Sequence, residues 1–189
     1  MGKLDGKVAV ITGGSTGMAL AGARLFVEEG AQVFIQGQRQ EALDDAVKII
    51  GRNVTAVQGD AAELDDLDRL YDTVKRKKGS IDVLWAGAGM GEPALLGEIT
   101  EEQFHRAFWL NEPHDRKIKV NVLTPGQVAT AKQEELFDEV TKAEFEFPHP
   151  RGKMDRRGEV ATVALFLASD DSSDVNRLEL VTDGGTTAI

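Results

Sequence analysis

A glycine-rich turn near the start of the chain has the residue types needed to hold a phosphate. Thr12-Gly13-Gly14-Ser15-Thr16-Gly17-Met18-Ala19 follows an apolar run at 7–11 and precedes an amphipathic stretch at 21–28. Glycines let a backbone turn tightly and approach a pyrophosphate, and free N–H groups in the first turn of a helix stabilise its charge. The order of strand, turn and helix predicts a nucleotide-binding loop, with a structural tight turn as the alternative.

A second pattern could supply acid–base chemistry. Tyr71 and Lys75 have the spacing Tyr-x-x-x-Lys, and Tyr71 is the only tyrosine in the chain. A tyrosine whose pKa is lowered by a neighbouring lysine can pass a proton to a carbonyl oxygen near neutral pH. However, Leu67, Leu70 and Val74 give this segment an apolar face opposite an acidic one, which is typical of a helix that covers a sheet. We interpret the spacing as a coincidence.

The elements that would position these residues alternate along the chain. Strands are predicted at 7–12, 31–37, 53–58, 81–86, 117–123 and 177–182, and helices at 16–29, 40–51, 63–78, 100–111, 131–143 and 157–169. This alternation predicts an α/β protein. We expect one Rossmann-like domain over 1–189, with a doubly wound parallel sheet of about six strands.

Further motifs follow in the order found in the short-chain dehydrogenase/reductase family, which the chain resembles over nearly its whole length. The glycine turn is similar to the family's Thr-Gly-x-x-x-Gly-x-Gly, and Asp60 resembles the Asp near the adenine. The segment 81–89 resembles the fourth strand with its Asn-Ala-Gly, 118–126 the penultimate strand with its Pro-Gly turn, and 183–185 the closing Asp-Gly-Gly. The resemblance implies a parent family of NAD(P)-dependent oxidoreductases. The cofactor-binding residues that it implies are Gly13, Ser15, Thr16, Gly17, Met18, Arg39, Asp60, Ala61, Ala86, Gly87, Ala88 and Thr130.

One segment of the family pattern is missing. Only four residues separate Asn111, which matches the Asn of the catalytic tetrad, from Arg116. There the family has a strand that ends in the catalytic Ser, followed by the helix that carries Tyr-x-x-x-Lys. The resemblance therefore implies an internal deletion between Asn111 and Arg116, with Asn111 as the only catalytic remnant.

The deletion also bears on sheet order and on assembly. With one strand removed, we expect the penultimate strand to pair with the fourth, in the order 3-2-1-4-5-6. The alternative is an empty slot, which would leave two strand edges unpaired. The lost helix forms part of the family's usual dimer interface, so the resemblance implies a monomer or a dimer of a different kind.

The expected cofactor site departs from the family pattern at several positions. Ala19 replaces the third glycine of the turn, and Gly87 replaces the Asn of the fourth strand. Gly37 offers no carboxylate to the ribose hydroxyls, which argues against NAD. Gln38 stands where many NADP-preferring relatives have Arg, so Arg39 is the nearby cation. These departures imply NADP, bound weakly or not at all, with NAD less favoured. Their clustering, together with the deletion, suggests an engineered or minimised scaffold.

Composition argues against several other classes of protein. Asp and Glu number 32 against 22 Lys and Arg, and this acidic balance argues against nucleic acid as a partner. The chain has no cysteine, and His105, His114 and His149 lack the spacing of a metal site, so we expect no bound metal. No leader or long apolar run is visible, so we expect a cytoplasmic protein without membrane contact.

Three functions remain as hypotheses. The first is a catalytically inactive Rossmann domain that keeps some affinity for a nucleotide. The second is a folding scaffold without ligand, in which Ala19 and Trp85 fill the pocket. The third is an NADP-dependent carbonyl reductase with His114 as a substitute proton donor. The first two are favoured, because general acid–base catalysis typically contributes roughly 10²–10⁴-fold to the rate.

Overall fold

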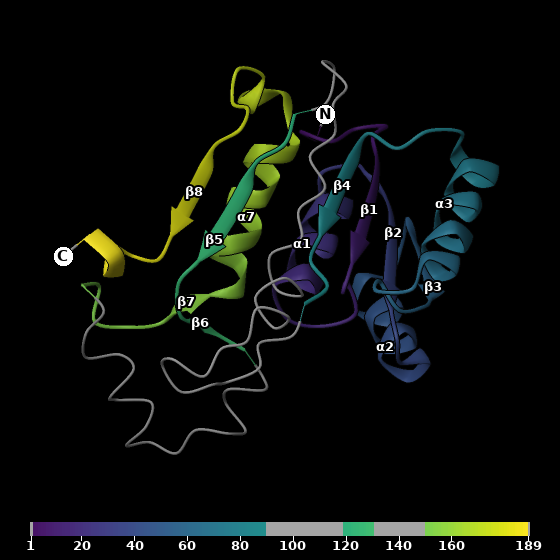
Figure 1. The fold of residues 1–189 in the computed structure, drawn as a ribbon, viewed down its shortest axis with the longest axis horizontal. Helices are drawn as coiled ribbons and strands as arrows, with labels where there is room; N and C mark the ends of the chain where they lie inside the picture. The colour runs from purple at the N-terminus through teal and green to yellow at the C-terminus, as the bar shows by residue number, and fades with distance from the viewer. Residues whose placement is uncertain (1, 90–118, 131–149, 189) are drawn as a thin grey trace.

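The computed structural model describes residues 2–89, 119–130 and 150–188 (Figure 1). The first part contains β1 (Val8–Thr12), α1 (Gly17–Glu28), β2 (Gln32–Gly37), α2 (Gln40–Ile50), β3 (Val54–Gln58), α3 (Leu64–Lys78) and β4 (Val83–Ala86). The other two ranges together contain β5 (Val122–Pro125), β6 (Val128–Ala129), β7 (Asp155–Arg156), α7 (Arg157–Ala168), β8 (Glu179–Thr182) and two short 3-10 helices, Asp170–Ser172 and Thr186–Ala188. The expected helices 100–111 and 131–143, the deletion point, Asn111 and the three histidines lie outside the described residues.

The first four strands form one parallel sheet in the order β3-β2-β1-β4. All five residues of β1 are buried, because the sheet is covered on both faces. On one face, Phe26 of α1 and Leu43 of α2 pack with Ile35, and on the other Leu70 of α3 packs with Phe34. The predicted α/β Rossmann-like parallel sheet is therefore confirmed, together with the first four places of its strand order.

The predicted pairing of the fourth and penultimate strands is wrong for the described strands. β4 pairs with β1, whereas β5 pairs in parallel with β8 in a separate two-stranded sheet. The physical reason lies in the helices, because α7 packs against α1 and Leu123 of β5 packs against the main core. A shift of β5 towards β4 would carry α7 with it against α1, and packed helices keep their axes about 8–10 Å apart. Helix packing thus outweighs the gain from pairing two free edges.

Helix ends in the first part follow the sequence signals closely. α3 carries Asp65 and Asp66 in its first turn and four basic residues in its last turn. Gly79 ends this helix with a φ of +85°, a conformation that glycine adopts without strain. The basic run 75–78 is therefore explained by its place at the negative end of a helix dipole. Within the described residues, no helix is both long and apolar enough to cross a membrane.

Arg177 adopts the left-handed backbone conformation, with a φ of +57°, just before β8. Its N–H donates to the carbonyl oxygen of Val120 at 2.8 Å, which holds the turn in this shape. A residue with a Cβ pays about 1–2 kcal/mol there. We expect Arg177→Gly to raise the free energy of unfolding by about 1 kcal/mol in urea titrations. Asn53→Gly, at a φ of +51°, is the control and should gain less, because asparagine tolerates this region. A destabilised Arg177→Gly protein would contradict the assignment.

Two carboxylates make stability depend on acid pH. The Thr187 hydroxyl and the N–H groups of Thr187 and Gly185 lower the pKa of Asp183 from 3.8 to about 2. The Arg151 guanidinium and the Arg156 N–H lower the pKa of Glu159 from 4.5 to about 2. Because the folded-state values are lowered, this stabilisation is present above the unfolded values and is lost as pH falls towards 2. We expect the melting temperature to fall over that window, and less steeply in Asp183→Asn. An equal slope in the variant would refute the role of Asp183.

Candidate nucleotide-binding site

The turn between β1 and α1 depends on two glycines for different reasons. Gly13 has a φ of +69°, and a Cβ there would lie 2.8 Å from the carbonyl oxygen of Gly87 and 2.9 Å from the N atom of Ala88. Gly13 therefore lets the turns that follow β1 and β4 approach each other. Gly17 has a φ of +62°, and no atom of the described residues lies within 4 Å of its hypothetical Cβ. Gly17 thus begins α1 beside open space.

The N-terminus of α1 carries no side-chain cap. Thr16 is extended, makes no capping hydrogen bond through its side chain, and the first turn contains no acidic residue. Neither Thr16 nor an acidic residue of the first turn therefore neutralises the positive end of the helix dipole. A phosphate is the group that such an end binds best, and the open space beside Gly17 leaves room for it.

Ala19 and Gly87 lie close to each other. A Cβ on Gly87 would lie 3.3 Å from the Cβ of Ala19 and 2.9 Å from the carbonyl oxygen of Thr12. The methyl group of Ala19 thus takes the space that a larger residue at 87 would need. The Thr12 hydroxyl accepts the N–H of Ala88 at 3.2 Å and ties the two turns together. The space at Gly87 is thus limited first by the Thr12 backbone oxygen and next by the methyl group of Ala19.

Trp85 fills the core beside α1. Its ring lies 6.0 Å from that of Phe26, and a Cβ on Gly22 would lie 2.0 Å from Cζ3 of the indole. The indole therefore contacts α1 at Gly22, more than one helical turn after Gly17, and no atom of the described residues lies close to the Gly17 position. The indole Nε1 also lies 3.4 Å from a hypothetical Cβ on Gly87, so Trp85 borders the turn after β4 as well as α1. The hypothesis that Ala19 and Trp85 fill the pocket therefore stays a prediction.

The ends of β2 and β3 form a polar cluster around Asp60. The Gln38 amide donates to Oδ2 of Asp60 at 2.8 Å, and the N–H of Ala62 donates to Oδ1 at 2.9 Å. Gln58 donates to the carbonyl oxygen of Gln38 at 2.9 Å. Arg39 is exposed and precedes α2 directly. Gln38 was not among the predicted site residues, because it replaces the Arg of NADP-preferring relatives and Arg39 was chosen instead. The predicted order 3-2-1 had already placed β2 beside β3.

The predicted site residues of the first part come together at one edge of the sheet. The turns after β1, β2, β3 and β4 all follow the carboxyl ends of parallel strands, which is where this class of fold binds ligands. Thr130 follows β6, at the edge towards which the arrows of β1, β4 and β5 point in Figure 1. Asn111 lies outside the described residues.

Tyr71 and Lys75 lie on α3. Tyr71 packs against the cluster of Val10, Phe34 and Leu70, and burial raises the pKa of its phenol above the usual 10.0. A proton donor near neutral pH needs the opposite shift. This environment supports the interpretation of the Tyr-x-x-x-Lys spacing as a coincidence.

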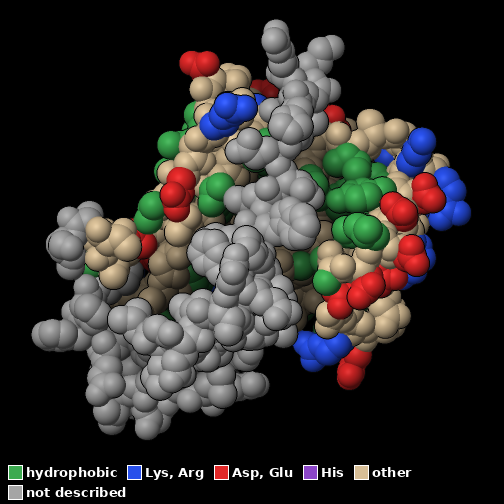
Figure 2. All heavy atoms as spheres, in the orientation of Figure 1, with side chains coloured by type: hydrophobic (Ala, Val, Ile, Leu, Met, Phe, Trp, Pro, Cys, Tyr) green, Lys and Arg blue, Asp and Glu red, His purple; other side chains and the backbone are tan. Residues whose placement is uncertain are grey.

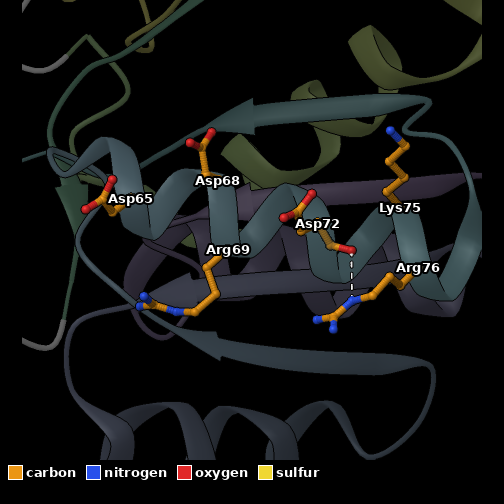
Figure 3. A pocket seen from close by; sticks show the side chains of 6 residues that line it. All are labelled: Asp65, Asp68, Arg69, Asp72, Lys75 and Arg76. Carbon is orange, nitrogen blue, oxygen red and sulfur yellow. Dashed lines mark hydrogen bonds between the residues drawn. The ribbon is translucent and has the colours of Figure 1, made fainter.

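The outer face of α3 bears a shallow hollow lined by charged side chains (Figure 3). The three acidic and three basic side chains balance in charge, so the hollow does not select a phosphate. Arg76 donates to the carbonyl oxygen of Asp72 at 3.3 Å, which is a contact within the helix. In the part of the chain that the structure describes, no group of three His, Asp or Glu side chains is placed to hold a metal ion.

Comparison with known proteins decides the family. The sequence model described as short chain dehydrogenase matches residues 7–113, more than half of the chain, and one described as Enoyl-(Acyl carrier protein) reductase matches 111–187. This chain belongs to the short-chain dehydrogenase family. The two matches of this short-chain dehydrogenase meet at 111–113, beside the predicted deletion.

Full-length relatives match the short-chain dehydrogenase from end to end. It is 36% identical to oxidoreductase asL5 of Sarocladium schorii, with 99% of this chain and 98% of the relative covered. That alignment runs over 244 positions, so at least 55 of them face no residue of the 189-residue chain. An NADP-dependent (R)-specific alcohol dehydrogenase of Lentilactobacillus kefiri is 25% identical, with 98% of each chain covered.

Solved structures show the same fold. A short-chain dehydrogenase/reductase from Brucella melitensis superposes with a TM-score of 0.86 at 20% identity, covering 98% of this chain and 99% of that one. A short-chain type dehydrogenase/reductase from Mycobacterium marinum gives a TM-score of 0.84 at 24% identity, with 98% and 97% covered. These superpositions therefore show the Rossmann fold. The family, which binds NAD(P), is shown by the sequence matches.

Gln38→Arg tests the adenosine end of the site. A guanidinium there should meet a 2′-phosphate with a charge-assisted hydrogen bond, which is worth about 1.5–3 kcal/mol. We expect the variant to bind NADPH at least about tenfold more tightly than the parent, with little change for NADH. Gln40→Arg, whose parent side chain bonds only Asp44 among the described residues, is the control for added charge. Equal gains for both nucleotides in calorimetry would contradict the assignment.

Proposed function

We propose that this short-chain dehydrogenase is a dinucleotide-binding domain without carbonyl turnover, which binds NADP(H) in preference to NAD(H). The observation that carries the proposal is the turn at 13–17, where positive-φ glycines lead into an uncapped helix beside open space. Gly13, Gly17 and the first turn of α1 would hold the pyrophosphate. Asp60 and Ala61 would lie near the adenine. When bound, the nicotinamide supplies or accepts a hydride.

The preference for NADP(H) rests on the end of β2. Gly37 has no carboxylate to accept the ribose hydroxyls, and the Asp60 carboxylate already accepts the Gln38 amide at 2.8 Å. Arg39 is exposed close by and can meet a phosphate. The relative from Lentilactobacillus kefiri is an NADP-dependent enzyme, which supports this preference.

The proposed loss of turnover rests on the missing acid. The only tyrosine of the chain lies on α3, with a raised pKa. At least 55 positions of the Sarocladium relative have no counterpart here. Without a positioned acid, the barrier to carbonyl reduction should rise by several kcal/mol, at about 1.4 kcal/mol per tenfold change in rate.

A turnover assay with NADPH and a panel of aldehydes and ketones tests this part of the proposal. We expect no NADPH oxidation above the protein-free rate, while NADPH still raises the melting temperature. Turnover that is lost in His114→Ala would contradict the proposal and establish the histidine as a substitute acid. Turnover that survives both His114→Ala and Tyr71→Phe would contradict it as well, and would place the acid elsewhere.

A further inference from the structure

A closed ring of hydrogen bonds joins the ends of β2 and β3 to the first turns of α3. Oδ2 of Asp60 accepts the Gln38 amide at 2.8 Å, and the Gln58 amide donates to the carbonyl oxygen of Gln38 at 2.9 Å. Arg69 donates to the carbonyl oxygen of Gln58 at 3.1 Å and to Oδ1 of Asp66 at 2.7 Å. Oδ2 of Asp66 accepts the N–H of Asp60 at 2.7 Å, which closes the ring. Both the backbone and the side chain of Asp60 are therefore held in place.

The contact between Asp66 and the turn after β3 is close. A Cβ on Gly59 would lie 3.0 Å from Cβ of Asp66 and 3.1 Å from its Oδ2, so the lack of a side chain at 59 lets this turn approach α3. The Asp66 side chain is 25% exposed. The N–H of Asp60, followed by the Arg69 guanidinium, holds the pKa of Asp66 below its usual 3.8, against the opposing effect of desolvation. Asp66 therefore accepts both hydrogen bonds as a carboxylate at neutral pH.

Asp60 keeps acceptor capacity beyond these contacts. Its Oδ1 accepts the N–H of Ala62 at 2.9 Å, and its Oδ2 accepts the Gln38 amide. A carboxylate has about four lone-pair sites, so about two remain beyond these two bonds. A carboxylate only accepts hydrogen bonds, so it selects a ligand group that donates. Adenine has such a donor in its 6-amino group, whereas hypoxanthine has a carbonyl oxygen at the same position.

We propose that Asp66 and Arg69 are positioning residues, which act through Asp60 to give the nucleotide site a preference for adenine over purines without a 6-amino group. This role rests on the proposed function, in which Asp60 lies near the adenine. Asp66 fixes the backbone of Asp60, and Gln38 fixes its side chain. Arg69 bridges Asp66 and Gln58, so that α3 and β3 keep one geometry at this turn. An acceptor held in this way loses little freedom when a ligand donates to it.

The place of Arg69 on α3 agrees with this role. Figure 3 shows its guanidinium at the N-terminal end of the helix, apart from the basic side chains of the last turn. Those basic side chains are explained by the helix dipole, whereas a cation near the positive end of a helix is not. Its hydrogen bonds to Asp66 and Gln58 give the reason for an arginine there.

The experiment compares two ligands on matched variants. The parent and each variant are titrated calorimetrically with NADPH and with its reduced hypoxanthine analogue, in which a carbonyl oxygen replaces the 6-amino group. Asp66→Ala removes the acceptor for the Asp60 N–H. Asp65→Ala is the control, because Asp65 also lies in the first turn of α3, but its side chain makes no hydrogen bond within the described part of the chain. The readout is the ratio of the two dissociation constants, which a general loss of stability leaves unchanged.

We expect the parent to bind NADPH at least about tenfold more tightly than the analogue, because the analogue lacks a hydrogen bond to a charged group. Asp66→Ala should lower this ratio by at least about threefold, whereas Asp65→Ala should not change it. Arg69→Ala, at an exposed position of α3, is the second variant. It should lower the ratio by a smaller factor, because Asp66 still accepts the N–H of Asp60.

An unchanged ratio in both Asp66→Ala and Arg69→Ala would overturn this role, and so would a parent that binds the two nucleotides equally. An equal fall of the ratio in Asp65→Ala would also overturn it, because the loss of charge alone would then be the cause. If Asp66→Ala shows no cooperative thermal melt, the ratio in Arg69→Ala decides alone. A parent that binds neither nucleotide would contradict the proposed function itself, and this role with it.

Discussion

Gly22→Ala should lower the free energy of unfolding by about 2–3 kcal/mol, although alanine is the better helix former. The new methyl carbon would lie 2.0 Å from Cζ3 of Trp85 and 2.7 Å from Cη2. The indole cannot move aside easily, because it is rigid and packs against Phe26 with ring centroids 6.0 Å apart. Urea unfolding followed by circular dichroism measures the change.

The control for Gly22→Ala is Gly158→Ala in α7. Gly158 is also a helical glycine, but no atom of the described residues lies within 4 Å of its hypothetical Cβ. We expect that variant to gain about 0.5–1 kcal/mol, which is the difference in helix propensity. The double variant Gly22→Ala/Trp85→Leu should be more stable than the sum of the two single changes predicts. Additive losses would mean that the indole and α1 are not in contact.

Gly13→Ala should abolish nucleotide binding and also destabilise the fold. Its positive φ costs about 1–3 kcal/mol for a residue with a Cβ. The methyl group would also lie 2.8 Å from the Gly87 carbonyl oxygen and 2.9 Å from the Ala88 N atom, which are backbone atoms that cannot rotate away. The turns after β1 and β4 would separate, and the carboxyl edge of the sheet would lose its shape. Melting with and without NADPH measures both effects.

Alanine variants of two other glycines distinguish backbone strain from damage to the nucleotide-binding site. Gly17 and Gly6 have φ values of +62° and +74°, and neither has an atom of the described residues within 4 Å of its hypothetical Cβ. Alanine should cost each a similar amount of stability, about 1–2 kcal/mol. Gly17→Ala should weaken NADPH binding as well, because its methyl group enters the space beside α1. Gly6→Ala should not, because it precedes β1 at the opposite edge of the sheet. Equal affinities in the two variants would contradict the site.

The first part of the fold was predictable because its local signals agree. The apolar run of β1, the glycine turn, and Gly79 after the basic end of α3 each mark an element boundary, and the structure places those boundaries within one or two residues. The start of β5 was predicted too early. The strand was predicted from 117, whereas its ladder with β8 begins at Val122. At Asn121 the side chain, not the backbone, accepts the N–H of Leu178, and it donates to the carbonyl oxygen of Val175.

The remaining features depend on contacts between distant segments. The separation of β4 from β5 follows from how α7 packs on α1, and no local pattern in either strand encodes it. Two contacts likewise join residues that only the sheet brings together. One is the close approach of Ala19 and Gly87, and the other is the hydrogen bond between Gln38 and Asp60. Motif spacing predicted where a nucleotide would bind, but it could not predict these contacts.

Calorimetric titration of the protein with NADPH and with NADH tests the central claim most directly. If the protein binds NADP(H) as proposed, we expect saturable heat with NADPH, weaker binding of NADH, and a melting temperature that rises with nucleotide concentration. Absence of heat and of any melting shift with both nucleotides, in a protein that still unfolds cooperatively, would contradict it. The glycine turn would then be a structural turn only.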